Sequence, residues 1–517
     1  MQKIQIYDTT LRDGTQSEGF TLSANDKVRV AQRLDTFGVA FIEGGWPGSN
    51  PKDVEFFERA CDTEWKNALI AAFGSTCRVK GGPEDDGNIK ALLDSHTPVC
   101  TIFGKTWTLH VNEVLQTTNE DNLRIIEDSV AYLKANGKRV LYDAEHFFDG
   151  YKADSAYAIE TLHAAIRGGA EMVVLCDTNG GTFPWEIERI MREIKPINHP
   201  IGIHSHNDGE LAVINSLTAV REGAVQVQGT INGVGERCGN VNLVSVIANL
   251  ELKMGYQCLP KGNIKYLYDL SHFVAEVANL TPDEHLPFVG KSAFAHKGGV
   301  HVAAMRRSSQ SYQHVDPALV GNKMRVVVSD LSGRGNLLSK AEEHGVEVEG
   351  AEVVPVLNEI KELEARGFSF EAAEASVAMM LKRQEFGYKP PFELIDFFVN
   401  VEHRDKRGIF AEAMVKVRVK GEVLHTAAEG NGPVNALDLA LRKALIGYYP
   451  QISRFNLSDY KVRILDSDHG TEAITRVLID TRNDTSRWST VGAGSNIIEA
   501  SWRALADSVE YGLMVAH

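Results

Sequence analysis

The first half of the chain repeats one pattern eight times: a short run of β-forming residues, followed by a stretch with helical periodicity. Successive runs begin about 32 residues apart, a typical length for one strand and its crossover helix. An open doubly wound sheet shows the same alternation, but its G-x-G-x-x-G phosphate fingerprint is absent, since Ile6 to Gly14 reads IYDTTLRDG. We therefore expect a closed (β/α)8 (TIM) barrel of the α/β class. The eight runs begin at Ile4, Val39, Ala68, Pro98, Arg139, Glu171, Pro200 and Val225.

The rest of the 517-residue chain has a different pattern, and its length leaves room for two or three domains. Beyond residue 250 the strand rhythm stops and helical sequence takes over. From Pro390 strand-like runs (FELIDFFVNV, AEAMVKVRVKGEV and ITRVLIDTR) alternate with two helical runs, each preceded by a pair of glycines. This repetition indicates two copies of one α+β unit, typical of a ligand-sensing or dimerising module. The predicted domains are the barrel (1–255), a mainly helical connector (256–389) and a duplicated α+β regulatory and dimerisation domain (390–517).

The composition excludes several classes of function. The 54 basic and 69 acidic residues give a formal net charge of −15, so the overall field repels a polyanion and we expect no nucleic-acid partner. No apolar run approaches membrane-spanning length, and the start MQKIQIYDTT alternates polar and apolar residues instead of forming a secretion signal. The six cysteines form no C-x-x-C pair, and a chain of this size needs no disulfides to build its core. We expect a reduced, cytoplasmic protein without membrane attachment.

Polar residues gather where the predicted strands end, which is where (β/α)8 enzymes place their chemistry. His204 and His206 are two apart on the seventh strand, so both imidazoles project from one face. With Asp13, which follows the first strand, they form a 2-His-1-carboxylate set suited to Mg²⁺, Mn²⁺, Fe²⁺, Co²⁺ or Zn²⁺. The alternative is a pair of hydrogen-bonded barrel histidines. Asn240 is either a weaker fourth ligand or a turn residue that tolerates positive φ.

Four further residues at these strand ends are candidates for catalysis or substrate binding. Arg12 can stabilise an oxyanion, and Glu43 at the end of the second strand can orient its guanidinium. The alternative for these two is a purely structural ion pair. Glu145 at the end of the fifth strand is a candidate general base. Thr178 after the sixth strand can donate its hydroxyl to a substrate carboxylate or cap a helix.

Three motifs in order give the chain a resemblance to a known family. DTTLRDGTQ (Asp8 to Gln16), HSHND (His204 to Asp208) and NGVGERCGN (Asn232 to Asn240) resemble the family of 2-isopropylmalate, homocitrate and citramalate synthases. The resemblance spans nearly the whole chain, because the C-terminal repeat looks like that family's allosteric regulatory domain. It implies a divalent-metal (β/α)8 acyltransferase that condenses acetyl-CoA with a 2-oxo acid and then hydrolyses the thioester.

The resemblance implies a role for each residue at the centre of the site. Asp13, His204 and His206 would be the metal ligands, with Asn240 as an auxiliary one. Arg12 would stabilise the enolate of acetyl-CoA. Glu43 would orient Arg12.

The same resemblance implies further catalytic and substrate-binding residues. Thr178 would bind the carboxylate of the oxo acid, and Glu145 falls where the family has a catalytic glutamate. His301 and Tyr312 fall where the connector of a neighbouring subunit completes the active site, which implies a homodimer. The usual G-I-H-Q-D-G around that histidine is here Gly299 to Ala304, GVHVAA.

Within the family, the opening segment and YDAEHFFDGYK look most like the citramalate synthase branch. That branch uses pyruvate, gives (R)-citramalate and CoA in isoleucine biosynthesis, and implies isoleucine as the effector. A 2-isopropylmalate synthase acting on 2-oxoisovalerate is the first alternative, and a metal-dependent lyase or aldolase is another. Related lyases carry G-G-C-P where this chain has Gly235 to Gly239, GERCG, which favours a synthase. A non-enzymatic metabolite sensor would have no need for the metal set.

Overall fold

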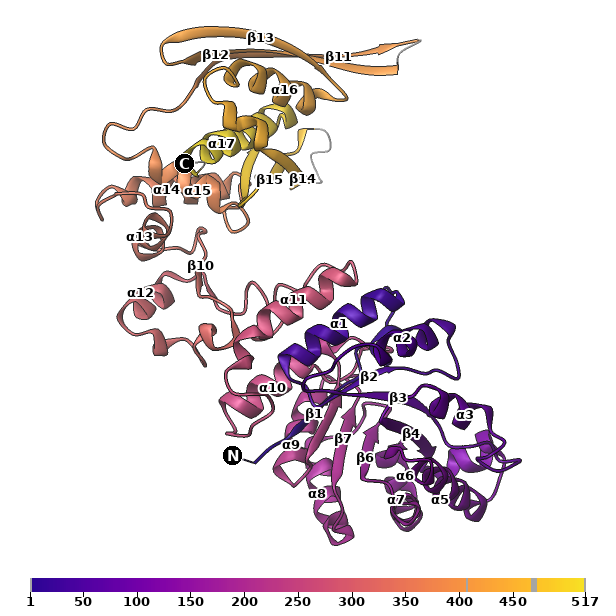
Figure 1. Cartoon of the computed structure of the whole chain (residues 1–517). Helices are drawn as coiled ribbons and strands as arrows, with labels where there is room; N and C mark the ends of the chain where they lie inside the picture. The colour runs from indigo at the N-terminus through magenta and orange to yellow at the C-terminus, as the bar shows by residue number, and fades with distance from the viewer. Residues whose placement is uncertain (1, 406–407, 466–471, 516–517) are drawn as a thin grey trace. The chain divides into compact units, whose positions relative to one another are not determined.

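A computed structural model of the chain describes residues 2–405, 408–465 and 472–515 (Figure 1). It divides into two compact units. The first contains the residues up to Phe294 together with Val315–Lys323, and the second contains Ala295–His314 and the residues from Met324 onward. None of the described helices is long and apolar enough to span a membrane.

The first unit is built around a closed barrel of eight parallel strands, in which β1 pairs with both β2 and β8. Each strand falls on one of the eight expected runs, so the predicted (β/α)8 barrel is confirmed. The strands are β1 (Gln5–Asp8), β2 (Phe41–Gly45), β3 (Leu69–Ser75), β4 (Val99–Lys105), β5 (Arg139–Glu145), β6 (Met172–Asp177), β7 (Ile201–Ser205) and β8 (Gln226–Gly229).

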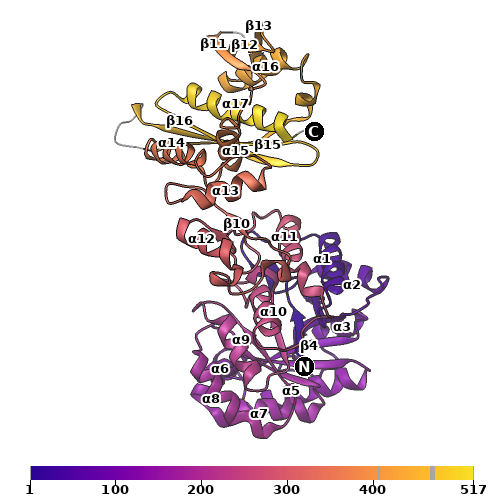
Figure 2. The same ribbon diagram turned by 90° about the vertical axis from the view of Figure 1, so that its left-hand side faces the viewer.

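Helices surround the barrel on its outside (Figures 1 and 2). Local sequence sets their ends: the Ser23 side chain caps the first helix in a capping box with Asp26, and Gly38 ends it in the left-handed conformation. The long helices are α1 (Ala24–Phe37), α2 (Pro51–Cys61), α3 (Gly87–Asp94), α5 (Asn119–Ala135), α7 (Ser155–Gly168), α8 (Pro184–Ile194), α9 (Ala212–Arg221), α10 (Leu243–Leu252) and α11 (Leu267–Val277). Shorter pieces are η1 (Gly14–Gln16), α4 (Thr108–His110), η2 (Val111–Leu115), α6 (Phe147–Ala153), η3 (Lys195–Ile197), η4 (Ile231–Gly233), η5 (Asn263–Tyr266) and η7 (Pro317–Val320).

The inside of the barrel changes from apolar to polar along its axis. Alternate residues of each strand point inward, and near the N-terminal ends they form an apolar cluster. Two positions further along β2, β4 and β5, the inward residues are Glu43, Thr101 and Asp143, all of them buried. The polar layer therefore faces the C-terminal mouth. The apolar cluster contains Tyr7, Phe41, Ala71, Val99, Leu141, Met172 and Val174.

The second unit begins with the helical segment that we expect as a connector. A two-stranded parallel pair joins β9 (Ala295–His296) to β10 (Arg325–Val326). The helices are α12 (Gly299–Arg307), η6 (Ser309–Ser311), α13 (Arg334–Glu343), α14 (Val353–Ala365) and α15 (Glu374–Lys382). The three-part domain division remains a prediction, because compactness separates two units only.

The end of the chain contains the same order of elements twice: a three-stranded antiparallel sheet followed by a helix. The predicted strand AEAMVKVRVKGEV is in fact two strands, because Lys420 and Gly421 take positive φ and turn the chain. The glycine before each helix permits close packing: a Cβ on Gly492 would collide with the carbonyl oxygen of Ala500. The first copy is β11 (Glu393–Arg404), β12 (Gly408–Val419), β13 (Glu422–Gly430) and α16 (Pro433–Leu445); after η8 (Pro450–Arg454) the second is β14 (Asn456–Ile464), β15 (Thr475–Arg482), β16 (Arg487–Gly494) and α17 (Ile497–Val515).

Candidate active site

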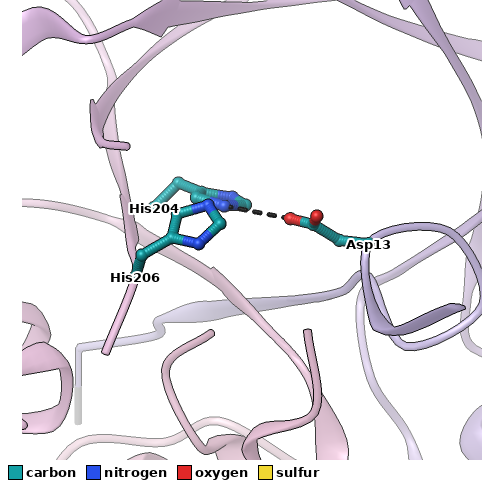
Figure 3. Close-up of side chains that lie close together, drawn as sticks. All are labelled: Asp13, His204 and His206. Carbon is teal, nitrogen blue, oxygen red and sulfur yellow. Dashed lines mark ion pairs between the residues drawn. The ribbon is translucent and has the colours of Figure 1, made fainter. Parts of the chain in front are cut away.

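The three predicted metal ligands converge at the C-terminal mouth of the barrel (Figure 3). Asp13 follows β1, His204 lies on β7 and His206 comes just after it. One potential ligand atom from each lies within 4.8 Å of the others, and all three residues are buried. His204 Nε2 is 3.2 Å from Asp13 Oδ2. The structure therefore brings together residues that are almost 200 positions apart in the chain.

The surrounding contacts fit a divalent ion at this point. His204 Nδ1 lies 2.9 Å from Gln228 Oε1, and a proton donated there leaves Nε2 with a free lone pair. The amide nitrogen of Asn240 lies 2.7 Å from Asp13 Oδ2 and 3.1 Å from His204 Nε2. His206 Nδ1 and Asn240 Oδ1 are buried without a hydrogen-bond partner among the described residues. Buried polar atoms without partners need an explanation, and a site for a bound ion is one that fits these two.

The charge states of Asp13 and His206 match what a metal requires, whereas for His204 burial is outweighed by the hydrogen bond to Asp13, which raises the pKa of His204. Burial opposes ionisation of Asp13, but Arg12 and a hydrogen bond with His204 hold the pKa of this carboxyl well below its usual range. Burial, followed by the neighbouring His204, lowers the pKa of His206 to about 4. At neutral pH Asp13 is therefore ionised and His206 is neutral, the states in which these side chains bind metals.

Arg12 is held at this site by a buried chain of hydrogen bonds. Its Nε donates to Glu43 Oε1 at 2.5 Å, and Glu43 Oε2 accepts from the Tyr7 hydroxyl at 2.6 Å. That hydroxyl is also 2.7 Å from Thr101 Oγ1. Arg12 Nη1 lies 3.2 Å from Asp13 Oδ1. The expected Arg12–Glu43 pair is thus present, and it fixes a guanidinium beside the metal ligands.

Glu145 and Thr178 lie on the same mouth of the barrel. Glu145, the last residue of β5, forms an ion pair with Lys105, the last residue of β4. Thr178 Oγ1 accepts a hydrogen bond from the His146 backbone N–H at 2.9 Å. The helix-cap alternative for Thr178 is wrong, because the next helix begins only at Pro184. The Thr178 hydroxyl proton therefore remains available to another acceptor.

One pocket of about 180 Å³ unites these side chains. Its apolar wall is formed by Trp46, Phe73 and Phe103, whose rings pack edge to face or stack with centroids 5.5 to 5.7 Å apart. The full lining is Arg12, Asp13, Gln16, Trp46, Phe73, Phe103, Asp143, Glu145, Cys176, Thr178, His204, His206 and Glu236.

His301 and Tyr312 belong to the second unit, where the structure brings them together. Their rings stack with centroids 4.2 Å apart. His301 lies on α12 and Tyr312 follows η6. The two predicted connector residues therefore form one feature of that unit.

Sequence reasoning missed several residues of the pocket. Asp143 could have been found, because it is two positions before Glu145 on a strand and so faces the same side. Burial raises the pKa of Asp143 to about 7. Lys105 ends β4, for which no candidate was proposed, and its position at the strand end is the signal that was overlooked. The aromatic wall had no recognisable motif.

A second grouping of possible ligands, in the second unit, is not a good metal site. Glu343, His344 and Glu374 lie close together. However, the buried Lys340 ammonium already lies 2.8 Å from Glu343 Oε2 and 3.0 Å from Glu374 Oε2. A metal there would displace Lys340 from its partners and leave a buried charge unpaired, which is costly.

Comparison with known proteins identifies the family. Residues 3–274 match the HMGL-like family, residues 288–367 match the homocitrate synthase post-HMGL domain-like family, and residues 344–513 match the LeuA allosteric (dimerisation) domain. The chain belongs to the HMGL-like family, whose match covers the residues that form the barrel.

Comparison with curated relatives points to particular enzymes of this family. The chain is 54% identical to an (R)-citramalate synthase of Geobacter sulfurreducens, over 99% of this chain and 98% of that protein. It is 50% identical to an (R)-citramalate synthase of Aquifex aeolicus, with the same coverage. A probable 2-isopropylmalate synthase of Methanopyrus kandleri is 30% identical over 98% of both chains. These findings confirm the resemblance that the three motifs suggested.

Proposed function

We propose that the protein is an (R)-citramalate synthase, an acyltransferase that condenses acetyl-CoA with pyruvate and hydrolyses the thioester to release (R)-citramalate and CoA. The observation that carries this proposal is nearly full-length identity of 42 to 54% to five proteins named (R)-citramalate synthase. Two 2-isopropylmalate synthases and a further (R)-citramalate synthase are 30% identical. The site supports it, because one pocket contains a metal-ligand set, a fixed guanidinium and a carboxylate base.

The metal would be held by Asp13, His204 and His206, with the Asn240 amide beside them. Bound there, a divalent ion such as Mg²⁺, Mn²⁺ or Zn²⁺ would supply Lewis-acid polarisation of the keto group of the oxo acid. Gln228 holds the ring of His204 in place from the other side.

Arg12 would stabilise the negative oxygen of the acetyl-CoA enolate. Glu43 immobilises the Arg12 guanidinium, and the guanidinium carbon Cζ lies 3.7 Å from the centroid of the Phe73 ring. A donor that is already fixed and partly desolvated needs little reorganisation when charge develops on the substrate. Glu43 would therefore act through Arg12.

Glu145 would remove a proton from the acetyl methyl group, and Thr178 would bind the carboxylate of the oxo acid. Glu145 is only partly buried and its carboxylate reaches the pocket. The Thr178 oxygen already accepts the His146 N–H, so its own proton points to another partner. A substrate carboxylate is such an acceptor.

The pocket favours a small oxo acid. Trp46, Phe73 and Phe103 form its apolar wall. Aromatic rings that pack against one another move little, so the methyl group of pyruvate would fit where an isopropyl group would collide with them. The wall thus supports pyruvate over 2-oxoisovalerate.

We also propose a cytoplasmic homodimer, in which His301 and Tyr312 complete the neighbouring subunit's active site. The match to the LeuA allosteric (dimerisation) domain supports an assembly of this kind. The duplicated α+β region of residues 390–517 would bind isoleucine as an end-product inhibitor of isoleucine biosynthesis. Removal of that region should abolish inhibition, and the oligomeric state should be measured on the same sample.

A thiol-release assay with acetyl-CoA tests the function directly. Pyruvate should give a kcat/KM at least tenfold higher than 2-oxoisovalerate or 2-oxoglutarate. A higher value for 2-oxoisovalerate would assign the protein to the 2-isopropylmalate synthases. Absence of thiol release with every oxo acid, in metal-loaded protein, would favour a lyase or aldolase.

A further inference from the structure

Glu145 forms an ion pair with Lys105, a residue for which the sequence motifs imply no role. The two residues end adjacent strands and are register partners in the barrel sheet. The Lys105 ammonium forms an ion pair with Oε2 of Glu145. Among the described residues, hydrogen bonds to this carboxylate involve Oε2 only, which leaves Oε1 for a substrate.

The scaffold fixes both ends of this pair. The Thr106 hydroxyl donates to the backbone carbonyl of Glu145 at 2.5 Å. The fully buried Asn122 on α5 donates from Nδ2 to the carbonyl of Lys105 at 2.8 Å, and the same nitrogen lies 2.8 Å from the Tyr157 hydroxyl. The backbone positions of Lys105 and Glu145 are therefore fixed by hydrogen bonds, unlike those of a typical pair on the surface.

The ammonium also lies against the aromatic wall. Lys105 Nζ is 5.4 Å from the centroid of the Phe103 ring, and that ring stacks on Phe73 at 5.5 Å. The opposite end of the same stack carries the guanidinium of Arg12. The Lys105 and Glu145 side chains are 18% and 23% exposed, so solvent screens their interaction less than that of a surface pair.

We infer that Lys105 is a positioning residue that holds the Glu145 carboxylate through Oε2 and presents its Oε1 to the substrate. The inference rests on the proposed function, in which Glu145 is the base. In that step a C–H bond of the acetyl methyl group breaks, the proton passes to Oε1, and the electron pair forms the enolate. Once Glu145 is neutral, the charge of Lys105 is no longer balanced, and it helps to stabilise the enolate.

The other groups near Glu145 contribute less charge at neutral pH. Burial lowers the pKa of His110, raises that of the Cys176 thiol and raises that of Asp143 to about 7. Among the described residues, Lys105 is thus the cation in direct contact with the Glu145 carboxylate. The titratable groups that face Glu145 are Lys105 on β4, His110 on α4, Tyr142 and Asp143 on β5 itself, His146 after β5, and Cys176 on β6.

The test compares pH profiles of three variants of the full-length, metal-loaded enzyme. Lys105→Met removes the charge but keeps most of the aliphatic part of the side chain, and Lys105→Arg retains a positive charge. Lys134→Met is the matched control, because Lys134 forms a similar pair with Glu171 but lies on α5 outside the barrel. Profiles of kcat/KM report the ionisation of the free enzyme.

We expect Lys105→Met to lower kcat at pH 7 about tenfold or more and to move the acid limb of the kcat/KM profile to higher pH. The kinetic isotope effect with trideuterated acetyl-CoA should increase, because proton transfer becomes slower. Lys105→Arg should restore most of the profile, and Lys134→Met should match the unmodified protein. Cooperative thermal unfolding of each variant is checked on the same samples.

Two results would overturn different parts of the argument. If Glu145→Gln abolishes activity but Lys105→Met keeps the same acid limb and isotope effect, Glu145 is essential and the role of Lys105 is wrong. If Glu145→Gln retains full kcat, the base has been assigned to the wrong residue and the proposed mechanism must change. Should Lys105→Met fold poorly, a failure of Lys105→Arg to show a normal acid limb would still count against the inference.

Discussion

Substitution of Glu43 by glutamine should separate a catalytic from a purely structural role for the Arg12–Glu43 pair. The Glu43 side chain is fully buried and accepts from Arg12 at 2.5 Å and from the Tyr7 hydroxyl at 2.6 Å. Glutamine has one acceptor oxygen, so one of these two donors would face its NH₂ group instead. We expect Arg12 to lose its fixed orientation.

The magnitude follows from the charge of the lost interaction. A hydrogen bond between charged groups contributes about 1.5 to 3 kcal/mol. If that amount is lost from the transition state only, kcat falls about 10- to 150-fold at 1.36 kcal/mol per factor of ten. The KM for pyruvate should change little, because Thr178 and the metal set are untouched.

The assay is steady-state thiol release, with thermal unfolding measured on the same protein. Glu171→Gln is the control, since Glu171 pairs with Arg139 at the opposite, N-terminal end of the barrel. A Glu43→Gln enzyme with unchanged kcat but a lower Tm would contradict a catalytic role for this pair. The pair would then be structural only.

Three further predictions concern the metal, the oxo acid and pH. His206→Ala should lower bound metal, measured by elemental analysis after dialysis, and stoichiometric metal in this variant would place the site elsewhere. Thr178→Val should raise the KM for pyruvate about tenfold, with little change in the KM for acetyl-CoA, because a hydrogen bond to a charged group is lost. An unchanged KM for pyruvate in this variant would contradict the prediction. Burial lowers the pKa of His344, so the folded state prefers its neutral form and stability is lost as pH falls below about 6.5. His344→Gln should therefore show a smaller fall in Tm between pH 7.5 and 5.5, and an identical fall would exclude this contribution.

Much of the fold can be predicted from the sequence because short β-rich runs and amphipathic helices alternate at a regular spacing. All eight barrel strands lie on the expected runs. The C-terminal strands were harder, since β14 and β16 mix polar and apolar residues without clear alternation. The split of one predicted strand depends on positive φ at Lys420 and Gly421, of which only the glycine signals a turn in the sequence.

The convergence of two predicted metal ligands can be expected for a similar reason, because a period of two places His204 and His206 on one face. The role of Lys105 cannot be expected in this way, because it depends on the register between β4 and β5, which sets Lys105 opposite Glu145. Behind His204, Gln228 contacts the imidazole and donates a hydrogen bond from Nε2 to Asp143 Oδ1. These contacts also depend on packing between strands that are distant in sequence. The sequence shows which side chains lie at a strand end, whereas the register between strands decides which of these side chains contact one another.

In the proposed reaction, this site joins the acetyl group of acetyl-CoA to pyruvate. The most direct measurement is identification of the product formed from carbon-13-labelled pyruvate and acetyl-CoA, by NMR and by chiral chromatography against standards. We predict labelled (R)-citramalate in a 1:1 ratio with free CoA. Recovery of unchanged pyruvate, or of a product that lacks the pyruvate carbons, would contradict the proposed function.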